Sequence, residues 1–323
     1  MIERTCALLE AMSEPRDLAD YQTGVPRWCD GCGDNAILAA VQRVCRDAGL
    51  APERTVFVSG IGCSSRLPHY MNTYGFHGTH GRALPIAEGV KMSRPDLAVF
   101  VDTGDGDALS IGAAHWIHAL RYNMDLTVLL HDNRVYGLTK KQASPTTPLG
   151  VATNTTPKGS YLPPLNPLTV TLGVSNVSFV AQAVDWIPDL LYRIVLAAYR
   201  HRGLSFVRIL QRCPEFMPGA FDPWIKDPSR MLLLHHERGI EVPADLARIY
   251  RERREHDPSD LAAAREIASI EDPIAVGILY RNDDAPLYED VRRAGVARGA
   301  DRIRAALDTE LDRFAIRTSS AEG

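Results

Sequence analysis

The sequence predicts an α/β fold with a doubly wound, mostly parallel sheet, an irregular N-terminal arm and a charged helical C-terminal extension. Two observations support the sheet. Short apolar runs alternate with segments whose apolar residues recur at helical spacing, the order typical of parallel sheets with helices on both faces. Polar or glycine-rich loops follow several of these runs. Ligands of such sheets bind beyond the carboxyl ends of the strands, so these loops are candidate site loops.

Composition limits the classes of function. The chain has 323 residues, of which 45% are hydrophobic and 24% charged, with a formal net charge of −4. Such values are ordinary for a globular protein with a sizeable core. No basic footprint indicates nucleic-acid binding, and no apolar run approaches the ~20 residues of a membrane span. The N-terminus has no apolar signal core, which predicts a cytoplasmic protein.

The elements follow in order. An irregular arm ends in a turn at Gly31 and Gly33, after which Asp34 can begin a helix to about residue 48. Further expected helices cover residues 83–93, 107–121, 188–202 and 302–314, and expected strands cover residues 55–59, 97–101, 126–130, 178–181, 204–210 and 274–280. The loops at 60–66, 102–107 and 131–142 should therefore meet at one edge of the sheet.

Two domains are expected. Residues 1–222 would form the main, site-bearing domain, and residues 223–323 a charged helical extension packed on it or on a partner. The run Arg251–His256 (RERREH) is interpreted as the solvated face of a helix.

Cysteines provide the first chemical signal. Cys29 and Cys32 form a Cys-x-x-Cys pair without a preceding strand, which disfavours a thioredoxin-like motif. Cys63 and Cys213 each follow an expected strand, so the four thiolates form a candidate metal set. Zinc and an iron–sulfur cluster both suit four thiolates, and spacing does not decide between them. Cys45 lies in a helix and is expected to be a core residue.

The run Gly104-Asp105-Gly106-Asp107 provides the second signal. It follows the strand LAVFVD, and Asn133 follows the next strand along the chain. Glycines allow the backbone to approach a diphosphate, while Asp105 and Asn133 offer the hard oxygens that Mg²⁺ prefers. A plain glycine-rich turn is the alternative interpretation of the motif taken alone.

Together these motifs resemble a known family. A GDG run followed by this Asn is similar to the thiamine-diphosphate fingerprint, which implies the thiamine-diphosphate-binding version of the α/β fold. The combination of motifs over about residues 20–220 resembles the beta subunit of 2-oxoacid:ferredoxin oxidoreductases, in particular the 2-oxoglutarate type. The segments that carry the resemblance are WCDGCG, GIGCSS, HGTHGRALPIAEGVK, GDGDALSIG, DNRVYGLTKKQASPT and CPEF.

The resemblance implies a set of site residues. Cys29, Cys32, Cys63 and Cys213 would hold one 4Fe–4S cluster, and Asp105, Asn133 and the carbonyl of Val135 would ligate Mg²⁺. Lys140 would contact the carboxylate of the 2-oxoacid, and His80 would act at the thiamine. The implied thiamine diphosphate site comprises Ile61, Gly62, Cys63, Ser64, His80, Gly104, Asp105, Gly106, Asp107, Asn133, Val135, Gly137 and Leu138. Asp132 and Lys141 depart from the residues common in the family.

The resemblance also implies a reaction and partners. The chain would oxidise a 2-oxoacid with coenzyme A and ferredoxin, and would be active only with an alpha subunit, as two copies of each chain. A non-redox thiamine-dependent lyase and a zinc-stabilised binding module remain the alternative functions. Neither a nucleic-acid partner nor a membrane partner is expected.

Overall fold

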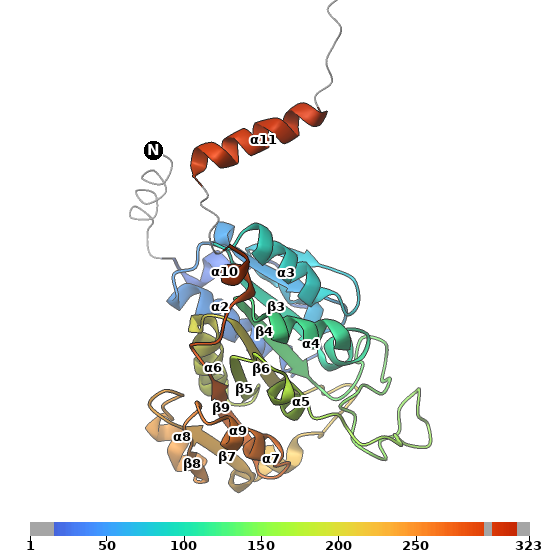
Figure 1. Cartoon of the computed structure of the whole chain (residues 1–323). Helices are drawn as coiled ribbons and strands as arrows, with labels where there is room; N and C mark the ends of the chain where they lie inside the picture. Colours follow the sequence, from blue (N-terminus) through green and yellow to red (C-terminus); the bar gives the residue numbers. More distant parts are fainter. Residues whose placement is uncertain (1–15, 294–298, 315–323) are drawn as a thin grey trace, which may run out of the picture. The chain divides into compact units, whose positions relative to one another are not determined.

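A computed structural model describes residues 16–293 and 299–314. Its strands form one nine-stranded sheet in the order β2-β1-β3-β4-β6-β5-β9-β7-β8 (Figure 1). Every pairing is parallel except that between β5 and β9. The strands are β1 (Thr55–Ser59), β2 (Tyr74–His77), β3 (Ala98–Gly104), β4 (Leu126–Asp132), β5 (Phe179–Val184), β6 (Leu204–Leu210), β7 (Met231–His235), β8 (Arg253–Glu255) and β9 (Ile274–Arg281).

Helices cover both faces of the sheet, which confirms the predicted doubly wound α/β class. One core joins the sheet to α2 and α6, and a second joins it to α3, α4, α5 and α9. The helices are α2 (Asp34–Asp47), α3 (Ala83–Ser93), α4 (Ala113–Tyr122), α5 (Pro167–Gly173), α6 (Pro188–Arg200), α7 (Asp222–Lys226), α8 (Ala244–Ile249), α9 (Leu261–Ala268), α10 (Tyr288–Arg293) and α11 (Ala300–Phe314).

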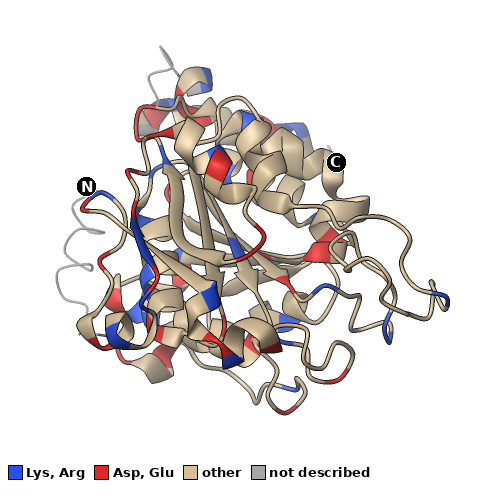
Figure 2. Ribbon diagram, turned by 90° about the horizontal axis from the view of Figure 1, so that it is seen from below, with Lys and Arg blue, Asp and Glu red and all other residues tan. Residues whose placement is uncertain are grey.

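The central strands are buried along their whole length. All residues of β1, β4 and β5 are buried, which explains why these strands are mostly apolar, because a strand covered on both faces has no solvent side. Charged residues lie mostly toward the periphery of the fold, and most of the sheet is uncharged (Figure 2). Cys45 is fully buried in the first core, as expected.

Two details differ from the sequence-based expectation. The helix expected over residues 107–121 begins with a π-helical turn, Asp107–Ile111, and becomes α4 only at Ala113; π-turns are frequent at functional sites. The helix face expected at Arg251–His256 is wrong, because Arg253–Glu255 form the edge strand β8 beside β7. Charged side chains on an edge strand discourage pairing with other chains.

The chain divides into two compact units. The first runs to Tyr288, and within it β7, β8 and β9 belong to the same sheet as the preceding strands. The second unit, Glu289–Gly323, includes α11, whose described residues are exposed. Among the described residues, no helix has both the length and the apolar character needed to cross a membrane.

Candidate active site

A cavity of about 600 Å³ lies at the carboxyl ends of β1, β3 and β4. The three loops predicted to meet do so here. Every residue predicted for the thiamine site lines this cavity: Ile61, Gly62, Cys63, Ser64, His80, Gly104, Asp105, Gly106, Asp107, Asn133, Val135, Gly137 and Leu138. Its walls also include His131, Tyr136, Thr139 and Gln142, which the motifs did not single out.

Asp107 holds these loops together. Its Oδ1 accepts hydrogen bonds from the backbone N–H groups of Ile61 (3.1 Å) and Gly81 (2.7 Å), and its Oδ2 accepts one from the Thr103 hydroxyl (2.7 Å). The carboxylate is buried, and a buried charge requires such partners. Asp107 therefore fixes the relative positions of the loops around the cavity.

Asp107 also orients His80. The His80 Nδ1 lies 2.6 Å from Asp107 Oδ1, and because a carboxylate only accepts, Nδ1 carries the hydrogen of this contact. The imidazole is partly exposed at the cavity wall. A histidine whose Nδ1 is held in this way keeps its Nε2 for exchange of a proton.

Two glycines permit this close packing. A Cβ atom at Gly60 would overlap the carboxylate of Asp107, and one at Gly106 would overlap the ring of Tyr136. The Tyr136 hydroxyl donates to the Gly106 carbonyl at 2.8 Å. The second glycine of the GDG run is thus required by the approach of Tyr136, a contact that the sequence motif alone does not reveal.

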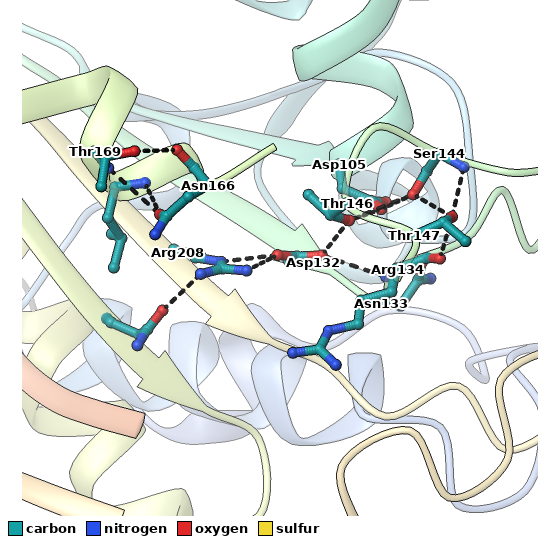
Figure 3. Close-up of polar contacts among 12 residues, drawn as sticks. Asp105, Asp132, Asn133, Arg134, Ser144, Thr146, Thr147, Asn166, Thr169 and Arg208 are labelled. Atoms are coloured by element: carbon teal, nitrogen blue, oxygen red, sulfur yellow. Dashed lines mark hydrogen bonds and ion pairs between the residues drawn. The ribbon is translucent and has the colours of Figure 1, made fainter. Parts of the chain in front are cut away.

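Asp105 lies in an unusual electrostatic environment (Figure 3). The hydroxyls of Ser144 (2.5 Å) and Thr146 (2.6 Å) both contact Asp105 Oδ2, and the Thr146 hydroxyl also lies 2.7 Å from Asp132 Oδ1. A hydroxyl has a single proton, so Thr146 cannot donate to both carboxylates at once. Burial, and then the charge of Asp132, raises the pKa of Asp105 to about 7.

Arg208 compensates the negative charge of Asp132 but not that of Asp105. Its Nε and Nη2 lie 2.8 and 2.6 Å from Asp132 Oδ2 (Figure 3). No Lys or Arg among the described residues forms a comparable ion pair with Asp105. The carboxylate of Asp105 therefore lines the cavity without a directly paired cation from the described part of the chain.

This environment fits a divalent cation. Asp105 and Asn133 both line the cavity, and Asn133 Oδ1 accepts the N–H of Val135 at 3.0 Å, which shapes the loop that carries the Val135 carbonyl. Mg²⁺ is usually held by few protein oxygens together with phosphates and water. Within residues 16–293 and 299–314, no three His, Cys, Asp or Glu side chains are grouped as a site for a single metal ion. A cation at Asp105 would therefore also need amide, carbonyl, phosphate or water oxygens as ligands.

Lys140 is the one predicted catalytic residue that does not line the cavity. It lies at the exposed rim, between Thr139 and Gln142, which do line it. Lys140 and Lys141 both have positive φ angles, 64° and 73°, a conformation that is uncommon outside glycine and clusters at functional sites. The Lys140 N–H donates to the Gly137 carbonyl at 2.9 Å, and its carbonyl accepts from Asn154.

The four predicted cysteines come from three loops that contact one another. The Gly33 N–H donates to the Arg212 carbonyl at 3.0 Å, and the Trp28 indole N–H donates to the Cys63 carbonyl at 2.8 Å. A Cβ atom at Gly137 would lie within 4 Å of the sulfurs of both Cys63 and Cys213. Cys29 is exposed, Cys32 and Cys63 are half-buried, and Cys213 is buried.

The environment of these thiols disfavours their deprotonation when no metal is bound. Burial raises the pKa of Cys63 to about 12 and raises that of Cys32 and of Cys213, and interactions among the cysteines contribute in the same direction. Metal coordination deprotonates a thiol outright. No three of these cysteines, in the part of the chain that the structure describes, are grouped as a site for a single metal ion. Four sulfurs from three adjoining loops are nevertheless the donor set of a 4Fe–4S cluster.

The sequence analysis did not single out the contacts among three buried side chains, those of Asp34, Asp102 and His131, because no motif marks them. The Asp34 Oδ1 lies 2.8 Å from His131 Nδ1, and His131 Nε2 lies 3.4 Å from Asp102 Oδ1. Burial lowers the pKa of His131, but the hydrogen bonds to Asp102 and Asp34 outweigh this effect and raise the pKa to about 9. Asp34 was expected only at the start of a helix, and tertiary pairing across the sheet gives it this further contact.

Comparison with known proteins identifies the family of the chain. Residues 60–209 match the C-terminal TPP-binding domain of thiamine pyrophosphate enzymes, and residues 247–294 match the C-terminal region of the pyruvate ferredoxin oxidoreductase beta subunit. A 2-oxoglutarate oxidoreductase subunit KorB from Mycobacterium tuberculosis is 42% identical over 84% of this chain and 79% of its own length. The chain belongs to the beta subunits of 2-oxoacid:ferredoxin oxidoreductases.

Other relatives of this beta subunit extend the comparison. The beta subunit of 2-oxoacid:ferredoxin oxidoreductase 1 from Aeropyrum pernix is 38% identical over 85% of this chain and 84% of its own. A solved 2-oxoglutarate:ferredoxin oxidoreductase from Magnetococcus marinus, with 2-oxoglutarate, coenzyme A and succinyl-CoA bound, aligns with a TM-score of 0.76 and 34% identity. That alignment covers 91% of this chain and 97% of the other.

Proposed function

We propose that the chain is the beta subunit of a 2-oxoglutarate:ferredoxin oxidoreductase, which converts 2-oxoglutarate, coenzyme A and oxidised ferredoxin reversibly to succinyl-CoA, CO₂ and reduced ferredoxin. The observation that carries this proposal is the convergence of all the predicted thiamine-site residues on one cavity. The 2-oxoglutarate specificity is supported by the similarity to the KorB subunits and to the Magnetococcus marinus enzyme.

The residues of this chain would bind and orient the cofactor. Asp105, Asn133 and the Val135 carbonyl would hold Mg²⁺, and the glycine loops would allow the diphosphate to approach the backbone. Asp107 would keep His80 at the cavity wall, with its Nδ1–H directed at the carboxylate and its Nε2 available to hold or transfer a proton. Lys140, at the rim, would attract the carboxylate of the entering 2-oxoacid.

Each implied cofactor has a defined chemical role. Thiamine diphosphate, when bound, supplies an electron sink for decarboxylation. A 4Fe–4S cluster on Cys29, Cys32, Cys63 and Cys213 would supply a one-electron acceptor. Burial of Cys213 and partial burial of Cys32 and Cys63 limit the access of water to the sulfurs, whereas exposed Cys29 would leave one side open to the electron acceptor.

A second subunit would complete the site. The carboxylate that assists thiamine catalysis at the aminopyrimidine is expected from an alpha subunit, in an assembly of two copies of each chain. Helix α11 supports a protein contact, because it exposes an apolar stripe of Ile303, Leu307, Leu311 and Phe314, and amphipathic helices bury such faces. We assign partner contact to part of the extension after residue 222, and ferredoxin docking to the neighbourhood of Cys29.

The location in the cell is proposed as cytoplasmic. Cys29, Cys32, Cys45, Cys63 and Cys213 are free thiols in the described structure. Cysteines remain reduced in the cytosol and form disulfides in oxidising compartments. A reducing compartment would also preserve the thiolates required for a cluster.

The function is tested by anaerobic purification of this chain alone and with a co-expressed alpha subunit. Iron, acid-labile sulfide, thiamine diphosphate and Mg²⁺ are quantified, and reduction of a viologen is followed with coenzyme A and either 2-oxoglutarate or pyruvate. We expect turnover only in the complex and a preference for 2-oxoglutarate. Zinc without iron, or decarboxylation without viologen reduction, would contradict the redox assignment.

A further inference from the structure

Two polar side chains of opposite character contact the sulfur of Cys32. The Gln211 Nε2 lies 3.3 Å from Cys32 Sγ, and the Asp34 Oδ2 lies 3.5 Å from the same atom. Gln211 and Asp34 are both buried. A low local dielectric strengthens electrostatic interactions, so both neighbours act on the sulfur with little screening.

The orientation of the Gln211 amide follows from its surroundings. Its Nε2 contacts both Cys32 Sγ and the Arg212 carbonyl oxygen. Both of these atoms accept hydrogen bonds, and the amide nitrogen has two hydrogens to donate. The NH₂ end of Gln211 is therefore directed at the sulfur.

Asp34 is held in place through its other oxygen. Its Oδ1 contacts His131 Nδ1 at 2.8 Å, while Oδ2 lies toward the sulfur. Asp34 opens helix α2, and the adjacent Gly33 N–H is tied to the Arg212 carbonyl. The contact of Oδ1 with buried His131 holds the carboxylate with its other oxygen beside Cys32.

His131 has two carboxylate neighbours, and only one of them reaches the sulfur. The imidazole lies between two carboxylates, those of Asp34 and Asp102. Of the three groups, the carboxylate of Asp34 is the one in contact with the sulfur, so its charge acts on the sulfur at the shortest range.

We propose that Asp34 and Gln211 set the reduction potential of the iron–sulfur cluster by acting in opposite directions on the Cys32 sulfur. The inference deepens the proposed function, on which it rests. Both are positioning residues, since they contact a cluster ligand and neither the substrate nor the thiamine. Hydrogen bonds to sulfur and net charge are established determinants of cluster potentials.

The sign of each effect follows from charge. Reduction adds one electron to the cluster, which is taken from the 2-oxoacid as it is oxidised and is later passed to ferredoxin; no bond is formed or broken at Cys32. The negative carboxylate of Asp34 disfavours the added charge and lowers the potential. The N–H of Gln211 stabilises the added charge and raises the potential.

The experiment is a potentiometric titration of the anaerobic complex with its alpha subunit, followed by electron paramagnetic resonance of the reduced cluster. The variants are Asp34→Asn, Gln211→Leu and Gln211→Glu. Asp30→Asn is the matched control, because Asp30 lies in the same turn, between Cys29 and Cys32, but is exposed, where water and salt screen its charge. Iron and sulfide content and thermal unfolding are measured for each protein.

Asp34→Asn is expected to raise the reduction potential of the cluster. The ratio of reduced to oxidised cluster should increase about tenfold or more, and a tenfold change is 59 mV for a one-electron couple. Gln211→Leu should lower the potential, because it removes the N–H donor. Gln211→Glu should lower it further, because it also adds a negative charge. Asp30→Asn should produce a smaller shift than Asp34→Asn.

The outcomes separate this inference from the function on which it rests. A wild-type complex without iron and sulfide would overturn both. A wild-type cluster whose potential is unchanged or raised in the Gln211 variants would overturn the inference and leave the function intact, as would an unchanged potential in Asp34→Asn. If Asp34→Asn does not retain the cluster, the two Gln211 variants decide the case, since both must lower the potential and Gln211→Glu must lower it more.

Discussion

Two cavities at opposite ends of the same strands differ in how their charges are compensated. The cavity at the amino ends of β1, β3 and β4 has a volume of about 700 Å³, similar to the 600 Å³ of the carboxyl-end cavity. At the amino end, buried Lys91 donates to Asp125 (2.7 Å) and to the Leu97 carbonyl (2.9 Å). At the carboxyl end, Asp105 has hydroxyl partners and a second carboxylate nearby.

This difference shows that volume does not identify the site. A compensated ion pair is stable without a ligand, whereas a buried carboxylate beside another carboxylate gains from a cation. Functional sites retain such unfavourable arrangements because a ligand relieves them. The carboxyl-end cavity, with its uncompensated Asp105 carboxylate, is therefore the one of the two that would be stabilised by binding a cation together with a cofactor.

The largest effect is expected for Asp105→Asn. This change removes a proposed Mg²⁺ ligand and should weaken Mg²⁺-dependent thiamine diphosphate binding by about 100-fold or more. The cofactor-free variant should be at least as stable as the wild type, because the repulsion with Asp132 is gone. Calorimetry and thermal unfolding measure the two effects; unchanged cofactor affinity would refute the role of Asp105.

Gly106→Ala should produce a smaller loss at the same cavity. The added methyl group would overlap the Tyr136 ring, and the ring must move from its place in the cavity wall. Overpacking of this kind costs about 1–3 kcal/mol, so we expect cofactor affinity to fall roughly tenfold. Gly89→Ala is a matched control, since a Cβ there meets nothing within 4 Å. Equal affinity in both variants would argue against the steric explanation.

Lys140→Ala should raise the apparent KM for the 2-oxoacid roughly tenfold, because Lys140 is exposed and the loss of a hydrogen bond to a charged group then costs about 1.5 kcal/mol. The KM for coenzyme A should change little. Lys141→Ala serves as the neighbouring control in the steady-state assay of the complex. If neither constant changes in Lys140→Ala, Lys140 is a surface charge only.

The stability of the cofactor-free chain should depend on the protonation of Asp105. Its pKa is raised to about 7 in the folded chain, so the folded state retains a proton that the unfolded chain releases near pH ~4. The contribution of Asp105 to the free energy of unfolding is therefore present at low pH and is lost as pH rises toward 7. Urea unfolding across this range should show a weaker decline for Asp105→Asn.

The smallest effect is expected at the amino-end cavity. Lys91→Met should lower the free energy of unfolding by about 1–2 kcal/mol, because it removes a hydrogen bond and an ion pair with a partly exposed partner. Thiamine diphosphate affinity should be unchanged. A marked loss of cofactor binding in this variant would show that the two cavities are coupled.

The sequence was most informative about the buried strands inside the sheet and the helices between them. Helix α3 (Ala83–Ser93) and strands β1 and β6 have the predicted bounds, because their apolar periodicity and flanking polar or glycine residues are local signals. The edge strands β2 and β8 were missed. All four residues of β2 are exposed, and β8 consists of charged residues, so neither carries the apolar pattern of a strand.

The sequence by itself determined the fold class and the loops that line the carboxyl-end cavity, because short motifs at strand ends fix those positions locally. Only the tertiary structure decided how these residues act on one another. Thr146 lies between Asp105 and Asp132, and Tyr136 packs on Gly106. Asp34 likewise reaches both His131 and Cys32. Most of these contacts join segments far apart in the chain, and their electrostatic consequences depend on burial and distance, which no local pattern encodes.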